Sequence, residues 1–268
     1  MSKRVLITGA AGGIGQATCR YFESRGYTVL CHARKRGQAE TMAVGSRIGV
    51  YGDLTEPQEL TALAQQVEKS GPLDVLVHNA GVLSTSTRKG PAGLGIQAEV
   101  NVVAPYALTQ ALAQHMQSSG DDPAVVVVAS KAANMHRGNS YLDLAEPDGS
   151  ALFGHYSLSK SAANAVVVAM AEKWPDLRIY STEPGFVKTK MTVANSSMPG
   201  LMAFLARFVS RSPESGAQRA FDFLFQAQAP SGSVVQGGRV IDSTGRNWVK
   251  AEHQAQLREL LSMAGHEV

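Results

Sequence analysis

The chain reads TGAAGGIG from Thr8 to Gly15, directly after the apolar run at residues 5–7 and directly before a segment of helical period. Glycines let a backbone turn tightly and approach another group closely, and the amides at a helix N-terminus attract a phosphate. A strand, a glycine-rich turn and a helix in this order predict a βαβ unit that binds the pyrophosphate of a dinucleotide. Gly9, Gly13 and Gly15 are separated by three residues and then by one, unlike the common G-x-G-x-x-G fingerprint. A glycine-rich turn without a ligand is the alternative.

The rest of the chain repeats this alternation of short β-branched runs and longer helical segments. Most of the runs are apolar at consecutive positions, which is typical of strands covered by helices on both faces. The predicted strands are residues 5–7, 28–31, 48–51, 75–77, 125–128, 178–180 and 239–241. The predicted helices are 13–25, 57–70 behind the cap residue Thr55, 95–117, 155–174, and 213–226 behind the cap residue Ser212.

Strands alternating with helices wind into a doubly wound sheet, because the crossovers between parallel strands are right-handed. We therefore expect residues 1–268 to form a single Rossmann-type α/β domain of about seven parallel strands with helices on both faces. The segments 84–95 and 228–238 are rich in Ser and Gly and are predicted to be loops.

Composition excludes several classes of protein. The 268 residues are 44% apolar and 18% charged, which is enough for a large core. The net charge is +3, and the only basic cluster, residues 34–36, is too short for a nucleic-acid footprint but suits a small anionic ligand. Cys19 and Cys31 lack metal-ligand spacing, so we expect buried free thiols and no metal site. No secretory start and no membrane-length apolar run is present, which favours a cytoplasmic protein.

A second motif carries possible chemistry. Tyr156 and Lys160 are four residues apart, which places both side chains on one face of a helix. An ammonium close to a phenol favours the phenolate, and a tyrosine tuned in this way can act as a general acid or base on an alcohol or carbonyl oxygen. The spacing alone also occurs on many solvated helices.

Taken in order along the chain, the motifs resemble those of the short-chain dehydrogenase/reductase family. The matching segments are the glycine motif at Thr8–Gly15, the N-A-G motif at Asn79, Ala80 and Gly81, the helix asparagine Asn101, the strand-end serine Ser130, the Y-x-x-x-K motif at Tyr156 and Lys160, and the turn Pro184-Gly185 followed by Thr189. His78 stands where a second asparagine is often found. The resemblance covers nearly the whole chain.

The resemblance implies a role for each catalytic candidate. Tyr156 would exchange a proton with the substrate oxygen, and Lys160 would lower its pKa and hydrogen-bond the nicotinamide ribose. Ser130 would donate to the same substrate oxygen, as an oxyanion-hole group does. Asn101 would hold a water in a proton chain. The alternatives are that Ser130 caps a turn and that Asn101 satisfies buried backbone at a helix kink.

Cofactor choice depends on the end of the second strand. Relatives that prefer NAD tend to carry an Asp there, whereas this chain has Ala33 followed by Arg34, whose guanidinium suits a 2′-phosphate. NADP(H) is therefore favoured over NAD(H); a solvated basic loop is the alternative. Asp53 and Leu54 resemble the residues that contact adenine, although Asp53 could equally form a turn before the next helix. The resemblance adds contacts from the remaining cofactor-site positions, which are Thr8, Gly9, Gly13, Ile14, Gly15, Asn79, Ala80, Gly81, Lys160, Pro184, Gly185, Val187 and Thr189.

The resemblance also divides the chain. Residues 1–130 would mainly bind the dinucleotide, residues 131–242 would hold the catalytic and substrate groups, and 243–268 would be a tail. Ser130 and Tyr156 are 26 residues apart, and the extra residues at about 138–153 resemble the insertion of the carbonyl reductase and retinol dehydrogenase branch. This insertion either obstructs the usual dimer contact or forms a surface loop, so a homodimer or homotetramer stays open. The tail would pack on the pocket or on a partner subunit.

Residues 186–212 are dense in apolar side chains and would form a lid over an apolar substrate, or an ordinary amphipathic helix. The favoured function is an NADP(H)-dependent oxidoreductase that interconverts a ketone or aldehyde and the matching alcohol. Two alternatives use the same fold: an epimerase or lyase that keeps its dinucleotide bound, and a non-catalytic dinucleotide sensor. No nucleic acid and no membrane is expected as a partner.

Overall fold

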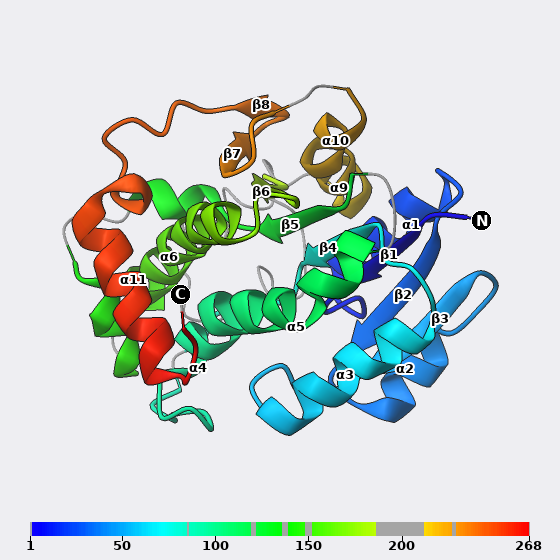
Figure 1. Ribbon diagram of the computed structural model, residues 1–268, viewed down its shortest axis with the longest axis horizontal. Helices are drawn as coiled ribbons and strands as arrows, with labels where there is room; N and C mark the ends of the chain where they lie inside the picture. Colours follow the sequence, from blue (N-terminus) through cyan, green and yellow to red (C-terminus); the bar gives the residue numbers. More distant parts are fainter. Residues whose placement is uncertain are drawn as a thin grey trace.

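Eight strands form one sheet in the order β3-β2-β1-β4-β5-β6-β7-β8 (Figure 1). The computed structural model describes residues 2–84, 86–118, 122–135, 139–147, 152–185, 212–226 and 229–267. The first seven strands are parallel to their neighbours, and β8 is antiparallel to β7. Their bounds are β1 Arg4–Ile7, β2 Thr28–Ala33, β3 Arg47–Tyr51, β4 Val75–His78, β5 Ala124–Val128, β6 Arg178–Glu183, β7 Ser233–Gln236 and β8 Arg239–Val240. The doubly wound α/β prediction is confirmed.

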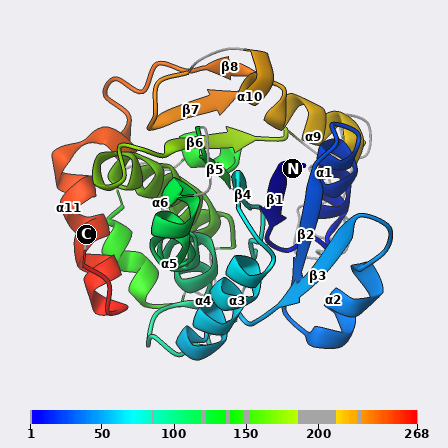
Figure 2. The same ribbon diagram turned by 45° about the vertical axis from the view of Figure 1, so that its right-hand side comes forward.

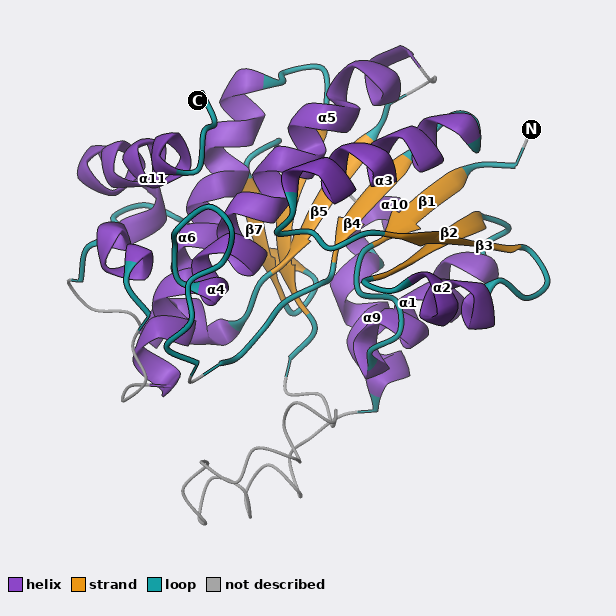
Figure 3. Cartoon of the chain, turned by 90° about the horizontal axis from the view of Figure 1, so that it is seen from below, coloured by secondary structure: helices purple, strands orange, loops and turns teal. Residues whose placement is uncertain are grey.

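The central parallel strands bury both of their faces, whereas the edge strand β3 is only partly buried. Side chains at alternate positions, such as Leu6 and Leu76, contribute to a core shared with the helices on one side. Their neighbours in sequence, such as Ile7 and Val77, contribute to a second core on the other side. Figure 3 shows α3, α5 and α6 over one face of the sheet and α1 and α9 over the other. Because helices cover both faces of the sheet, the strands carry apolar residues at consecutive positions.

Helices lie at all five predicted places with different ends, and α2 and α11 are helices that the sequence analysis did not include. Their bounds are α1 Gly13–Glu23, α2 Arg36–Met42, α3 Pro57–Lys69, α4 Ile96–Ala98, α5 Ala104–Ser118, α6 Leu152–Lys173, α9 Pro213–Phe221, α10 Phe223–Gln226 and α11 Ala251–Met263. Ser212 caps α9 as predicted, since its hydroxyl accepts from the Ser215 amide at 3.2 Å. The prediction for Thr55 is wrong: Glu56 is the N-cap of α3, and the Thr55 hydroxyl donates to Asp53 instead.

The last strands also differ from the prediction. The segment 228–238 contains β7, whose Val234 and Val235 are buried, and residues 239–241 do not form a parallel strand. Gly237 and Gly238 have φ values of +63° and +80°. Two consecutive glycines in this conformation make the tight turn of a hairpin, which returns the chain as the antiparallel β8.

The predicted insertion and tail pack against each other. The described part of the insertion contains a 3₁₀ helix, η3 (Tyr141–Ala145), that packs against α6 and α11. Tyr141 is fully buried there, with its hydroxyl 2.8 Å from that of Ser161. Figure 2 shows α11 lying along α6, so the tail packs on its own chain. Within the described residues, no helix is long and apolar enough to cross a membrane.

Candidate active site

The glycine-rich turn lies at the carboxyl edge of the sheet, where it is clamped by the start of the next motif. The Asn79 side chain donates to the carbonyls of Thr8 and Gly9 at 2.9 and 3.1 Å. The Thr8 hydroxyl accepts from the Ala80 amide at 3.0 Å. The two motifs that the sequence places 71 residues apart are therefore one structural unit between β1 and β4. Ligands of open α/β sheets bind at such a point, where strand order reverses.

Two glycines of this turn have no room for a side chain. Gly9 has a φ of +63°, and a Cβ there would lie 2.9 Å from the Ala80 Cα. A Cβ on Gly15 would lie 2.8 Å from the Ala10 Cα and 2.9 Å from the Asn79 Nδ2. Gly13 and Ile14 begin α1, whose N-cap residue Gly12 makes no side-chain capping bond. The first amides of α1 are thus positioned as a phosphate would require.

Sequence reasoning missed a third residue that holds this turn. The Nδ1 of His32 accepts from the Gly9 amide at 3.1 Å, and its Nε2 lies 2.8 Å from the Gly52 carbonyl. His32 is 3% exposed, and burial lowers its pKa. The signal in the sequence is a histidine at the end of the apolar run of β2, where a small or apolar residue would be expected.

Arg34, the residue that the sequence predicts to contact a 2′-phosphate, directly follows β2. Ala33 is buried as the last residue of β2, and Arg34 is exposed directly after it. Arg36 begins α2 and is bonded to Glu40 at 2.8 Å. Asp53 follows β3, and its Oδ1 accepts from both the amide and the hydroxyl of Thr55. That carboxylate oxygen forms the turn that the sequence left as an alternative, and Leu54 lies half-buried beside it.

Tyr156 lies on α6 and Ser130 follows β5, and the Ser130 hydroxyl is close enough to act on the pKa of the Tyr156 phenol. Burial raises the pKa of Tyr156, while the neighbouring Ser130 hydroxyl lowers it. The predicted lowering of this pKa by Lys160 is not found, because burial of the phenol has the largest effect and Lys160 is not among the groups that shift it. Ser130 also accepts from the Ala132 amide at 3.2 Å, so it caps a turn as well as contacting Tyr156.

Lys160 is 6% exposed and donates from Nζ to the Val128 carbonyl at 3.0 Å. Burial lowers the pKa of Lys160 to about 8. A Cβ on Gly81 would lie 3.3 Å from this Nζ. Because Gly81 has no side chain, the Lys160 ammonium has room beside the N-A-G motif.

Asn101 lies in a π-helical turn, η1 (Glu99–Val103), between α4 and α5. Its side chain accepts from the Val82 amide and donates to the Val82 carbonyl, both at 2.9 Å. It also donates to the Ser159 hydroxyl at 3.0 Å. Asn101 thus satisfies backbone at a helix irregularity, which is the alternative that the sequence left open.

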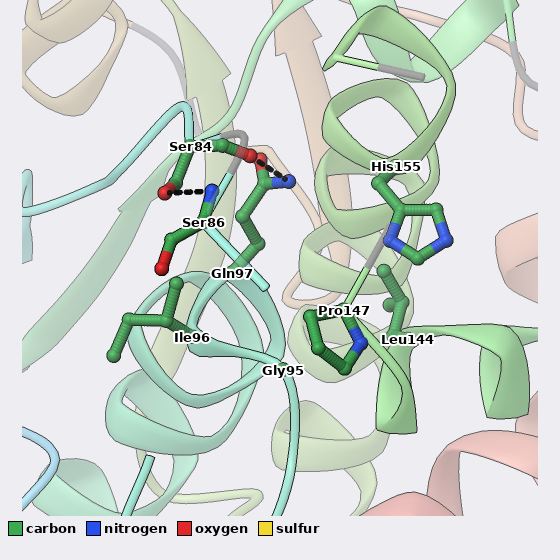
Figure 4. A pocket seen from close by; sticks show the side chains of 8 residues that line it. All are labelled: Ser84, Ser86, Gly95, Ile96, Gln97, Leu144, Pro147 and His155. Carbon is green, nitrogen blue, oxygen red and sulfur yellow. Dashed lines mark hydrogen bonds between the residues drawn. The ribbon is translucent and has the colours of Figure 1, made fainter. Parts of the chain in front are cut away.

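A small pocket lies beside His155, between residues 84–97 and residues 144–155 (Figure 4). His155 directly precedes Tyr156 and faces, across the pocket, the loop that follows Gly81. Gln97 donates to the Ser84 carbonyl at 3.1 Å, and its Oε1 is buried without a hydrogen-bond partner among the described residues. The lining residues are Ser84, Ser86, Gly95, Ile96, Gln97, Leu144, Pro147 and His155.

The remaining predicted contacts lie after β6. Pro184 is buried, and Gly185 has a φ of +82°, which suits glycine. The predicted contacts Val187 and Thr189, and most of the predicted lid, lie outside the described residues. Within the described part of the chain, no three His, Cys, Asp or Glu side chains are grouped as metal ligands. Cys19 and Cys31 are buried free thiols, as expected.

Known proteins with related sequences include oxidoreductases. The short-chain dehydrogenase chyC of Penicillium rubens is 30% identical over 195 residues, which cover 70% of this chain and 72% of the relative. The bovine dehydrogenase/reductase SDR family member 13 is 30% identical over 237 residues, which cover 81% of this chain and 60% of the relative.

Solved structures share the fold at lower identity. An uncharacterised protein of Mycobacterium paratuberculosis is 23% identical with a TM-score of 0.75, covering 99% of this chain and 94% of its own. A gluconate 5-dehydrogenase of Burkholderia cenocepacia, solved with NADP and tartrate, is 19% identical with a TM-score of 0.67, covering 88% of this chain and 94% of its own. The family model for short chain dehydrogenases matches residues 3–200. On this match, and on the relatives at 30% identity, the chain belongs to the short-chain dehydrogenase family and is an oxidoreductase that uses a nicotinamide dinucleotide.

Proposed function

We propose that this protein is an NADP(H)-dependent oxidoreductase that interconverts a ketone or aldehyde and the matching alcohol, with Tyr156 as the acid/base. The observation that carries the proposal is the position of Tyr156, whose ring centre lies 6.0 Å from the buried ammonium of Lys160 and whose phenol is close enough to Ser130 for that hydroxyl to lower its pKa. These groups come from β5 and α6 and meet at the edge of the sheet that also holds the glycine-rich turn. A proton donor and a dinucleotide site at one edge are what carbonyl reduction requires.

The residues of the turn fit a dinucleotide. Gly9 and Gly15 keep the backbone free of side chains, and the N-terminus of α1 offers amides to a pyrophosphate. Ala33 places no carboxylate at the end of β2, and the exposed Arg34 offers a planar cation to a 2′-phosphate. The NADP complex of the related gluconate 5-dehydrogenase supports this choice by analogy. The nicotinamide, when bound, supplies or accepts the hydride.

The chain's own residues handle the proton. Burial keeps Tyr156 protonated at neutral pH, so its hydroxyl can donate to a carbonyl oxygen during reduction. Ser130 offers a second hydroxyl to the same oxygen and stabilises the charge that develops there. Lys160, with a pKa of about 8, is charged at neutral pH and can bind the ribose hydroxyls and support the loss of the tyrosine proton in the oxidative direction.

The pocket at His155, the residue before Tyr156, has a mixed lining, since Ile96, Leu144 and Pro147 are apolar and Ser84, Gln97 and His155 are polar. An apolar carbonyl substrate is therefore proposed from the apolar residues of segment 186–212 alone. A cytoplasmic location and a homodimer or homotetramer complete the proposal.

The test is the oxidation of NADPH by the purified protein, followed by absorbance, in the presence of a panel of apolar ketones and aldehydes. We expect one class of carbonyl compound to be reduced with NADPH, and more slowly with NADH. A protein that binds NADPH and returns it unchanged with every compound, while epimerising or cleaving one of them, would replace this proposal with the epimerase or lyase alternative.

A further inference from the structure

His32 is the residue from which we draw a further inference, because it connects two segments of the dinucleotide site and has no part in the chemistry. Its Nδ1 lies 3.1 Å from the Gly9 nitrogen, and its Nε2 lies 2.8 Å from the Gly52 oxygen. Gly9 belongs to the turn that would hold the pyrophosphate, and Gly52 directly precedes Asp53 at the adenosine end. The ring therefore spans the site from β1 to β3.

The two partners settle which ring nitrogen carries the proton. An amide N–H can only donate, so Nδ1 must be an unprotonated acceptor. A carbonyl oxygen can only accept, so Nε2 must carry the hydrogen. The neutral Nε2–H tautomer satisfies both partners, and neither the imidazolium nor the other tautomer does.

We propose that neutral His32 is a positioning residue that holds Gly9 in its dinucleotide-binding conformation, and that its protonation weakens dinucleotide binding. In the imidazolium, Nδ1 also carries a hydrogen. The Nδ1–H would then face the Gly9 N–H, and neither group could accept a hydrogen bond from the other. Gly9 cannot yield easily, because Asn79 and Ala80 hold it from the other side. To remove this repulsion, either the glycine-rich turn or the His32 ring would have to move. A movement of the turn would disturb the proposed pyrophosphate-binding site.

The surroundings favour the neutral ring. His32 is 3% exposed, and burial lowers its pKa from the ordinary value, while the Gly52 carbonyl and the Asp53 carboxylate raise it. Asp53, two residues after β3, is the charged group that acts on the ring, and Arg34 directly follows the end of β2, two residues along the chain from His32. The folded-state pKa lies below 6.5, so the neutral form prevails at pH 7 and protonation occurs on acidification below that value.

The inference rests on the proposed dinucleotide site, and the probe is NADP⁺, which is stable in acid. Calorimetric titrations between pH 8 and pH 5 would compare the wild type with His32→Gln and His32→Leu. Glutamine keeps one acceptor and one donor but does not titrate, whereas leucine keeps the volume and removes both bonds. The 2′-phosphate of NADP⁺ also titrates at about pH 6, and that contribution is common to all three proteins.

We expect the affinity of the wild type for NADP⁺ to fall more steeply with acid than that of His32→Gln, approaching about tenfold more per pH unit below the His32 pKa. His32→Leu should bind about tenfold more weakly at pH 8, because the Gly9 amide loses its partner. His253→Gln, a change to another buried histidine far along the chain on α11, should keep the wild-type profile. Equal pH profiles for the wild type and His32→Gln would overturn the inference.

A second measurement needs no ligand. Long-range ¹H–¹⁵N spectra of the ligand-free protein should show His32 as the Nε2–H tautomer at pH 7, and the Gly9 amide shift should move with the same midpoint as the ring on acidification. A Gly9 amide indifferent to the His32 titration would also overturn the inference. If the spectra agree but the wild type binds no NADP⁺ at any pH, the proposed function fails while the coupling of His32 to Gly9 stands.

Discussion

Lys160 Nζ lies 6.0 Å from the centre of the Tyr156 ring, four residues away along α6. The sequence predicts this proximity, since residues at i and i+4 share a helix face. It does not predict that the ammonium would be drawn to the Val128 carbonyl and buried there. Burial lowers the pKa of the lysine to about 8, and burial of the tyrosine itself raises the pKa of the phenol rather than lowering it.

The buried ammonium should cost stability. Because the pKa of Lys160 is about 8 when folded and near 10.5 when unfolded, the unfolded state binds more protons between these values. Lys160→Met should therefore be more stable than the wild type by about 2 kcal/mol at pH 7, with the difference narrowing as the pH rises from 8 to beyond 10. Denaturant unfolding at several pH values measures it. A methionine variant less stable than the wild type at pH 7 would show that the Val128 bond outweighs desolvation.

The same pKa sets a pH limit on turnover. Lys160 is charged below about pH 8 and neutral above it, so reductive kcat/KM should decline as the pH rises through this value. In Lys160→Arg the guanidinium stays charged, and the residual activity should show no such decline. A wild-type profile that stays flat to pH 10 would separate the lysine charge from catalysis.

The glycine turn gives a matched pair of substitutions. Gly15→Ala would place its Cβ against the Gly9 carbonyl and 2.8 Å from the Ala10 Cα, so the turn must shift. We expect at least tenfold weaker NADPH binding and a loss of about 2 kcal/mol in the free energy of unfolding. Gly37→Ala, in α2 with nothing within 4 Å, should instead gain about 0.5–1 kcal/mol. Fluorescence titration and thermal unfolding of both variants measure the contrast; equal behaviour would show that the turn adapts freely.

Cofactor preference depends on Arg34. A charge-assisted bond to a 2′-phosphate contributes about 1.5–3 kcal/mol, so Arg34→Ala should bind NADPH about 10- to 100-fold more weakly and NADH within about twofold of the wild type. Arg36→Ala is the control, because that guanidinium is already bonded to Glu40. If Arg34→Ala loses both dinucleotides equally, the arginine has no part in phosphate recognition.

Local patterns account for what the sequence predicted. Apolar runs and glycine spacing placed β1–β6 and the turn between β1 and α1, because each signal lies within a few residues. The resemblance of the motifs at Asn79, Ser130 and Tyr156 to those of a known family predicted a shared site, and Asn79 and Ser130 follow the carboxyl ends of β4 and β5 closely.

Long-range contacts account for what it did not predict. β7 depends on two positive-φ glycines and a partner strand about 50 residues away. The link from His32 to Gly9 and Gly52 joins three strands, and no local pattern contains it. The pKa of Tyr156 depends on burial by the whole fold rather than on one neighbour.

The central claim is that Tyr156 moves the proton, and Tyr156→Phe tests it most directly. The measurement is the rate of NADPH oxidation with a reactive carbonyl compound, together with NADPH affinity by fluorescence, in the wild type, in Tyr156→Phe and in Tyr141→Phe. Tyr141→Phe removes another buried hydroxyl, the one beside Ser161, and should lose about 1 kcal/mol of stability with activity kept. We predict that Tyr156→Phe binds NADPH as the wild type does and turns over at least about 100-fold more slowly; a Tyr156→Phe protein that oxidises NADPH at the wild-type rate would contradict the account.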